Sequence, residues 1–72
     1  MTHTIVEVRD DEGRLVTKVV VGCPDTAIDF GHWLVARGYG VCMFDDLLDN
    51  HPRTPREKVA ADALAEMYAR SQ

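Results

Sequence analysis

The fold is decided by residues 4–21, TIVEVRDDEGRLVTKVVV, in which two β-branched runs flank an acidic turn. Thr4–Arg9 and Leu15–Val21 are rich in valine, isoleucine and threonine, the residue types that favour strands. Residues 10–13, Asp-Asp-Glu-Gly, have the composition of a type I turn that ends in a left-handed glycine. The stretch therefore predicts an antiparallel hairpin in which the first residue of the turn pairs with Arg14.

This pairing divides the side chains of the hairpin between two faces, because successive strand residues point to opposite sides of a sheet. One face carries four valines, interrupted by a lysine: Val6, Val8, Val16 and Val20. The other face is interrupted by more polar residues and carries Ile5, Leu15, Val19 and Val21. We expect the valine face to contact the helices, which leaves the second set as a candidate dimer face.

Two helices and a third strand follow the hairpin. Residues 24–37 begin with proline and an aspartate and end before Gly38, a residue suited to a left-handed C-cap. Residues 39–44 are a short apolar run that predicts a strand, which a crossover would place beside the first. Residues 55–70 follow Thr54 in a Thr-Pro-Arg-Glu capping box, which predicts a helix.

The predicted fold is therefore an α+β domain of order ββαβα, with a small three-stranded, mainly antiparallel sheet and two amphipathic helices packed on one face. A chain of 72 residues is a single domain, here 1–72, at most. The first helix carries an apolar stripe of Ala27, Ile28, Phe30, Gly31, Leu34 and Val35, and the last helix one of Val59, Ala60, Ala63, Leu64 and Met67.

Composition and charge restrict the function. The net charge of −4 argues against binding to nucleic acid or to an anionic membrane, both of which need a basic surface, and fits a protein partner that is neutral or has a basic surface. No apolar run approaches the length of about 20 residues that spans a bilayer. The first residues lack the features of a signal peptide, so we expect a cytoplasmic protein with Cys23 and Cys42 as buried thiols.

The patterns that resemble catalytic or metal sites are weak, and we expect no enzyme activity, no cofactor and no metal. Cys23, His32, Cys42 and His51 contain no close pair of the kind that zinc sites use. Cys23 and His32 lie nine positions apart, which on a helix is about 13 Å along the axis and too far for a nucleophile and its base. The one serine, Ser71, lies near the C-terminus.

The segment Asp45-Asp46-Leu47-Leu48-Asp49 allows three interpretations. Its spelling resembles the aspartate-rich motif of isoprenoid synthases, which implies metal ions that hold a diphosphate, but that family has a large all-helical fold. The alternatives are a solvated helical turn in which the two leucines anchor the segment to the core, and an acidic patch that faces a partner.

Our leading hypothesis is a non-enzymatic protein-interaction module with acidic and aromatic binding positions. These are the hairpin tip, one row on the first helix and the acidic segment: Asp10, Asp11, Glu12, Asp29, Trp33, Arg37, Asp45, Asp46 and Asp49. Tryptophan and arginine are enriched at interface hot spots. The alternative for Trp33 is that its ring folds over the edge of the core against Tyr68.

The hairpin, the helix opened by Gly22-Cys23-Pro24-Asp25, the further strand and the last helix make a short, acidic chain. In size, charge and element order it resembles small phage-encoded inhibitors of host defence, among them the anti-CRISPR proteins. The resemblance implies a stoichiometric inhibitor that covers a basic, nucleic-acid-binding surface of its target. The other function classes that we retain are a homodimeric accessory protein and a metal-dependent activity at residues 45–49.

Overall fold

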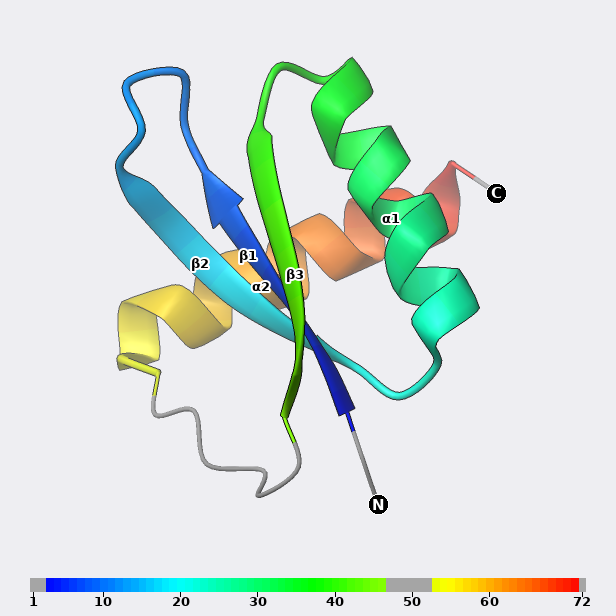
Figure 1. Ribbon diagram of the computed structural model, residues 1–72. Helices are drawn as coiled ribbons and strands as arrows, with labels where there is room; N and C mark the ends of the chain where they lie inside the picture. Colours follow the sequence, from blue (N-terminus) through cyan, green and yellow to red (C-terminus); the bar gives the residue numbers. More distant parts are fainter. Residues whose placement is uncertain (1–2, 47–52, 72) are drawn as a thin grey trace.

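The computed structural model describes residues 3–46 and 53–71, and its elements follow the predicted order ββαβα (Figure 1). The strands are β1 (His3–Arg9), β2 (Leu15–Val21) and β3 (Gly40–Asp46), and the helices are α1 (Pro24–Ala36) and α2 (Pro55–Arg70). The strands form one antiparallel sheet in the order β2-β1-β3. This confirms the α+β class and the position of the third strand beside the first.

The hairpin turn forms as predicted. The Asp10 amide donates to the Arg14 carbonyl at 2.9 Å, and the Gly13 amide donates to the Asp10 carbonyl at 3.1 Å. Gly13 has a φ of 83°, which a residue with a side chain rarely adopts. The Asp10 carboxylate also accepts from the amides of Glu12 and Arg14, both at 2.9 Å, so it fixes the turn.

A β-bulge at Val16 changes the register of the hairpin beyond the turn. Arg9 lies opposite Leu15, but Val8 lies opposite Thr17, so Val16 is an extra residue in β2. The extra residue shifts every later side chain of β2 to the other face of the sheet. Our prediction of the two hairpin faces was therefore wrong for the part of β2 that follows Val16.

The candidate dimer face is not a single surface for this reason. Val19 lies in the core, and Val21 packs against the core from the same side. Ile5 is on the opposite face, between Val20 and Phe44 of the neighbouring strands, but it is fully buried. Leu15 is exposed. The four residues Ile5, Leu15, Val19 and Val21 therefore cannot contact a second copy together.

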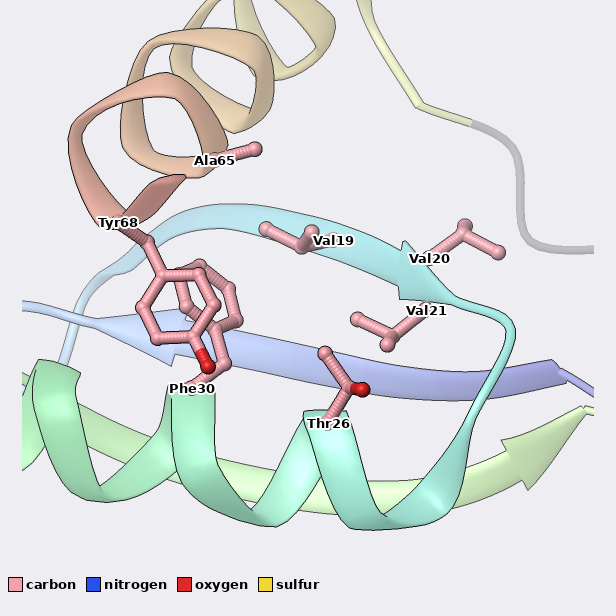
Figure 2. Close-up of a pocket in the computed structure, with 7 residues that line it drawn as sticks. All are labelled: Val19, Val20, Val21, Thr26, Phe30, Ala65 and Tyr68. Atoms are coloured by element: carbon pink, nitrogen blue, oxygen red, sulfur yellow. The ribbon is translucent and has the colours of Figure 1, made fainter. Parts of the chain in front are cut away.

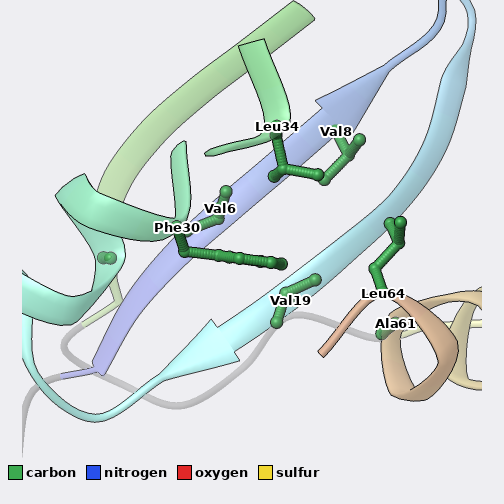
Figure 3. Packing of buried hydrophobic residues seen from close by; sticks show 8 residues of the cluster. Val6, Val8, Val19, Phe30, Leu34, Ala61 and Leu64 are labelled. Carbon is green, nitrogen blue, oxygen red and sulfur yellow. The ribbon is translucent and has the colours of Figure 1, made fainter. Parts of the chain in front are cut away.

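Both helices pack on the face of the sheet that carries Val6, Val8 and Val19 (Figure 3). The helices contribute the remaining buried side chains of the core: Ala27, Phe30, Leu34, Ala61 and Leu64. α1 packs on β1 and β3, whereas α2 packs mainly on β2. The helices thus share one core but rest on different strands.

The predicted apolar stripe of α2 does not match the face of the helix that packs on the core. Val59 is 70% exposed, and Met67 is also exposed, whereas Ala61 is buried. The buried Thr17 hydroxyl explains this orientation, because it donates to the Glu57 carbonyl at 2.5 Å and holds the first turn of α2 against β2. The predicted capping box of Thr54 and Glu57 is confirmed.

The bulge gives a test of the register. Deletion of Val16 would return Thr17, Val19 and Val21 to the face away from the helices, so we expect a loss of more than about 3 kcal/mol and non-cooperative unfolding in urea. The control is Val16→Ala, which keeps the register and should cost at most about 1.5 kcal/mol. If the deletion variant unfolds as cooperatively as the control, the bulge does not determine the fold.

Candidate functional site

Three aromatic rings join α1 to α2, the buried Phe30 and the half-buried Trp33 and Tyr68. Phe30 and Trp33 of α1 stack with ring centroids 5.8 Å apart. Tyr68 of α2 packs edge-on against both, at 5.0 Å from Phe30 and 5.7 Å from Trp33. The guanidinium carbon of Arg37 lies 4.8 Å from the centre of the Trp33 ring, within the range of a cation–π contact. These four residues, which we call the aromatic cluster, therefore bridge the two helices.

The predicted row of Asp29, Trp33 and Arg37 lies along one side of α1, and Tyr68 of α2 contacts its first two members. Trp33 is half-buried and its ring packs against Tyr68. This is the alternative that we gave for Trp33, in which the ring folds over the edge of the core. The Tyr68 hydroxyl donates to the Asp29 carboxylate. This hydrogen bond, desolvation and the negative charge of Asp29 all raise the pKa of Tyr68 above its ordinary value, because each disfavours the phenolate.

A groove opens beside the aromatic cluster, between α1, α2 and β2 (Figure 2). Its volume is about 150 Å³. Its lining comes from all three elements and is apolar apart from one hydroxyl on each helix: Val19, Val20, Val21, Thr26, Phe30, Ala65 and Tyr68. Pockets for drug-sized ligands measure roughly 300–1,000 Å³, whereas about 150 Å³ accommodates a single ring of the size of benzene. The groove therefore fits one bulky apolar side chain.

Acidic side chains lie next to the groove on both helices. Asp25 and Asp29 flank Thr26 and Phe30 on α1, and Asp62 lies one turn before Ala65 on α2. All three are exposed. A ligand that inserts an apolar group here would therefore meet negative charge around it.

The other predicted partner-binding residues do not converge on this groove. Asp11 and Glu12 lie exposed at the tip of the hairpin, where Glu12 pairs with Arg14 at 3.6 Å. Asp45 lies opposite Thr4, at the other end of the sheet. The acidic positions thus occupy separate places rather than one patch.

The predicted helical turn does not begin at Asp45, because Asp45 and Asp46 belong to β3, and residues 47–49 of the predicted turn lie outside the described residues. The metal hypothesis requires a helical segment that brings Asp49 onto one face with Asp45 or Asp46, and the strand at residues 45 and 46 does not supply the start of such a segment. Asp49 lies outside the described residues. Among the residues that are described, no three histidine, cysteine, aspartate or glutamate side chains gather as a metal-binding group.

Both cysteines are free thiols, but the prediction that they are buried was wrong. Cys23 is the exposed N-cap residue of α1, and Cys42 is exposed on β3, opposite Glu7 of β1. The backbone amides of Thr26 and Asp25 at the start of α1 lower the pKa of Cys23 below its ordinary value, because they favour the thiolate. The exposed His32 lies on α1, and His51 lies outside the described residues.

No protein family, curated protein or solved structure matches this chain. Within residues 3–46 and 53–71, no helix has the length and apolar character needed to cross a membrane. The function of the candidate site is therefore inferred from the geometry of the site alone.

The sequence predicted Trp33 and Arg37 as binding residues but did not indicate Thr26 and Ala65, which line the groove. Ala65 could have been found from the sequence, because it lies one helical turn before Tyr68.

The hydrogen bond between Tyr68 and Asp29 can be tested by titration. We expect Tyr68 to ionise above the ordinary range of tyrosine, and Asp29→Asn to lower its pKa. Because folding favours neutral Tyr68, its stabilising effect is complete below the ordinary tyrosine pKa and is lost as the pH rises through the raised value. NMR of ring-labelled tyrosine would follow the ionisation.

Asp25→Asn is the matched control, since it removes a carboxylate from the same helix that does not bond to Tyr68. It should leave the pKa of Tyr68 unchanged. Identical Tyr68 titration curves for the wild type and Asp29→Asn would contradict the hydrogen bond.

Proposed function

We propose that the chain is a non-enzymatic protein-interaction module that binds a partner protein through the groove between α1 and α2. The observation that carries this proposal is an apolar groove, sized for one side chain, that shares Phe30 and Tyr68 with the aromatic cluster. Interface hot spots combine a pocket for an apolar anchor with tryptophan, tyrosine and arginine around it. The groove and the aromatic cluster together have this composition.

The charge around the groove favours a partner with a basic surface. Exposed Asp25, Asp29 and Asp62 would attract lysine or arginine residues beside the inserted side chain. Such contacts raise the association rate and orient the partner more than they increase affinity, and salt screens them. Binding should therefore weaken as the salt concentration rises.

In the more specific form of this proposal, the module is a stoichiometric inhibitor. A partner that uses a basic surface to bind nucleic acid would lose access to it when the acidic module covers that surface. The support for this form is the acidic surface beside the groove and the resemblance in size, charge and element order to anti-CRISPR-type inhibitors.

Substitution within the groove tests the proposal with selected peptides in place of the natural partner. Ala65→Arg places a long cationic side chain at the groove, whereas Ala63→Arg places the same side chain at an exposed position two residues away on α2. A displayed peptide library selected on the wild type should yield peptides with an aromatic or branched aliphatic residue next to lysine or arginine. We expect Ala65→Arg to weaken their binding at least tenfold and Ala63→Arg to change it less than about twofold.

The salt dependence of the selected peptides provides a second readout, since their affinity should fall between low and high salt. If the two arginine variants bind these peptides equally well, the groove is not the binding site. Circular dichroism of both variants would confirm that they remain folded.

A further inference from the structure

Exposed apolar side chains gather along the outer edge of the sheet at β3. Ile28 and Val35 of α1 are 50% and 59% exposed, and Met43 of β3 is 37% exposed. Ile28 and Val35 lie seven residues apart, hence on the same side of α1, and Gly31 lies between them. A Cβ atom at Gly31 would overlap the terminal methyl group of Met43 and lie 3.5 Å from Val41 Cγ1. The three exposed residues therefore form one apolar strip, which we call the edge strip.

Several of the features that normally protect an edge strand are missing from the described part of β3, although its last two residues, Asp45 and Asp46, are charged. β3 has no lysine, no proline and no bulge, and seven consecutive residues pair regularly with β1. No other strand among the described residues pairs with its outer side. The opposite edge differs, because Arg53 Nη1 donates to the Lys18 carbonyl of β2 at 3.1 Å and α2 packs on that strand.

The alternation of backbone groups indicates which residues of β3 face outward. The Asp10 amide points to β2, so the polar backbone groups of Arg9, Glu7 and Ile5 point to β3. Their partners on β3 point back to β1, and these are Gly40, Cys42 and Phe44. The N–H and C=O groups of the remaining residues point away from the sheet, and these are Val41, Met43 and Asp45.

We infer that a second copy of this chain pairs along β3 and joins the two sheets into one of six strands. The pairing is antiparallel about a two-fold axis, with Met43 of the two copies opposite each other and Val41 of each copy opposite Asp45 of the other. This arrangement pairs the outward backbone groups of all three residues. It uses a different surface from the hairpin face that the sequence predicted, and it goes beyond the proposed partner binding.

The position of α1 supports a second copy as the occupant. α1 packs about equally on β1 and β3. With strands about 4.8 Å apart, its axis would lie about 5 Å from the two-fold axis, so the two α1 helices would be about 10 Å apart. Packed helices lie about 8–10 Å apart. Ile28 and Val35 of the two copies would then meet above the paired strands, and the edge strip would be buried against itself.

Charge and size also fit a symmetric pair. Antiparallel pairing keeps Asp45 of the two copies at opposite ends of the interface, whereas parallel pairing would bring these like charges together. The paired strands would be about 23 Å long, with α1 of each copy above them. The groove between α1 and α2 lies on the other side of α1, so a dimer would leave it open.

Sedimentation equilibrium of the full chain over about 1–500 μM tests the dimer. We expect the wild type to dimerise, and Ile28→Glu and Val35→Glu each to raise the dimer dissociation constant at least tenfold, because both would bury a carboxylate. Val59→Glu is the matched control, since Val59 is a 70% exposed valine on α2 away from β3. It should leave the dissociation constant unchanged.

Amide hydrogen exchange of the wild type identifies the strand that pairs. The amides of Val41, Met43 and Asp45 should become protected as the concentration rises, with at least a tenfold slower exchange in the dimer. A strict monomer at 500 μM would overturn the inference. The inference would also be overturned if Val35→Glu and Val59→Glu changed the dimer dissociation constant by the same factor.

Discussion

Val16 is the extra residue of β2, and its insertion decides which side chains of the hairpin face the helices. Without it, Lys18 and Val20 would point toward α1 and α2, and Val19 would point away. With it, Thr17 and Val19 lie on the same face as Val6 and Val8, and both helices pack on that face to form the core. The bulge therefore determines where both helices can pack.

The two edges of the sheet differ as a result. Thr17 holds the start of α2 through the Glu57 carbonyl, and Arg53 bonds to the β2 edge at Lys18, so α2 lies over β2. α1 takes the other half of the face and leaves the β3 edge uncovered by any described element. The helices meet where Tyr68 contacts Phe30, and the groove lies beside that contact. Both proposed binding surfaces thus follow from how the helices divide one face.

Local signals in the sequence predicted the elements well. The turn that ends at Gly13, the proline at the start of α1 and the capping box at Thr54 depend on neighbouring residues only, and each forms as predicted. The register of β2 and the rotation of α2 were not predicted, because both depend on contacts between distant residues, such as Thr17 with Glu57. For the site, helical spacing predicted the row that contains Trp33, but the groove needed the relative placement of three elements.

The register at the bulge is tested most directly by cross-strand contacts between α-protons in an NMR spectrum. In the bulged hairpin, Glu7 lies opposite Lys18 and Ile5 opposite Val20. Both are pairs without mutual hydrogen bonds, whose Cα atoms are about 4.5 Å apart, so their α-protons should give strong nuclear Overhauser effects. A strong effect between the α-protons of Glu7 and Thr17 would instead indicate a hairpin without the bulge and would contradict this account of the fold.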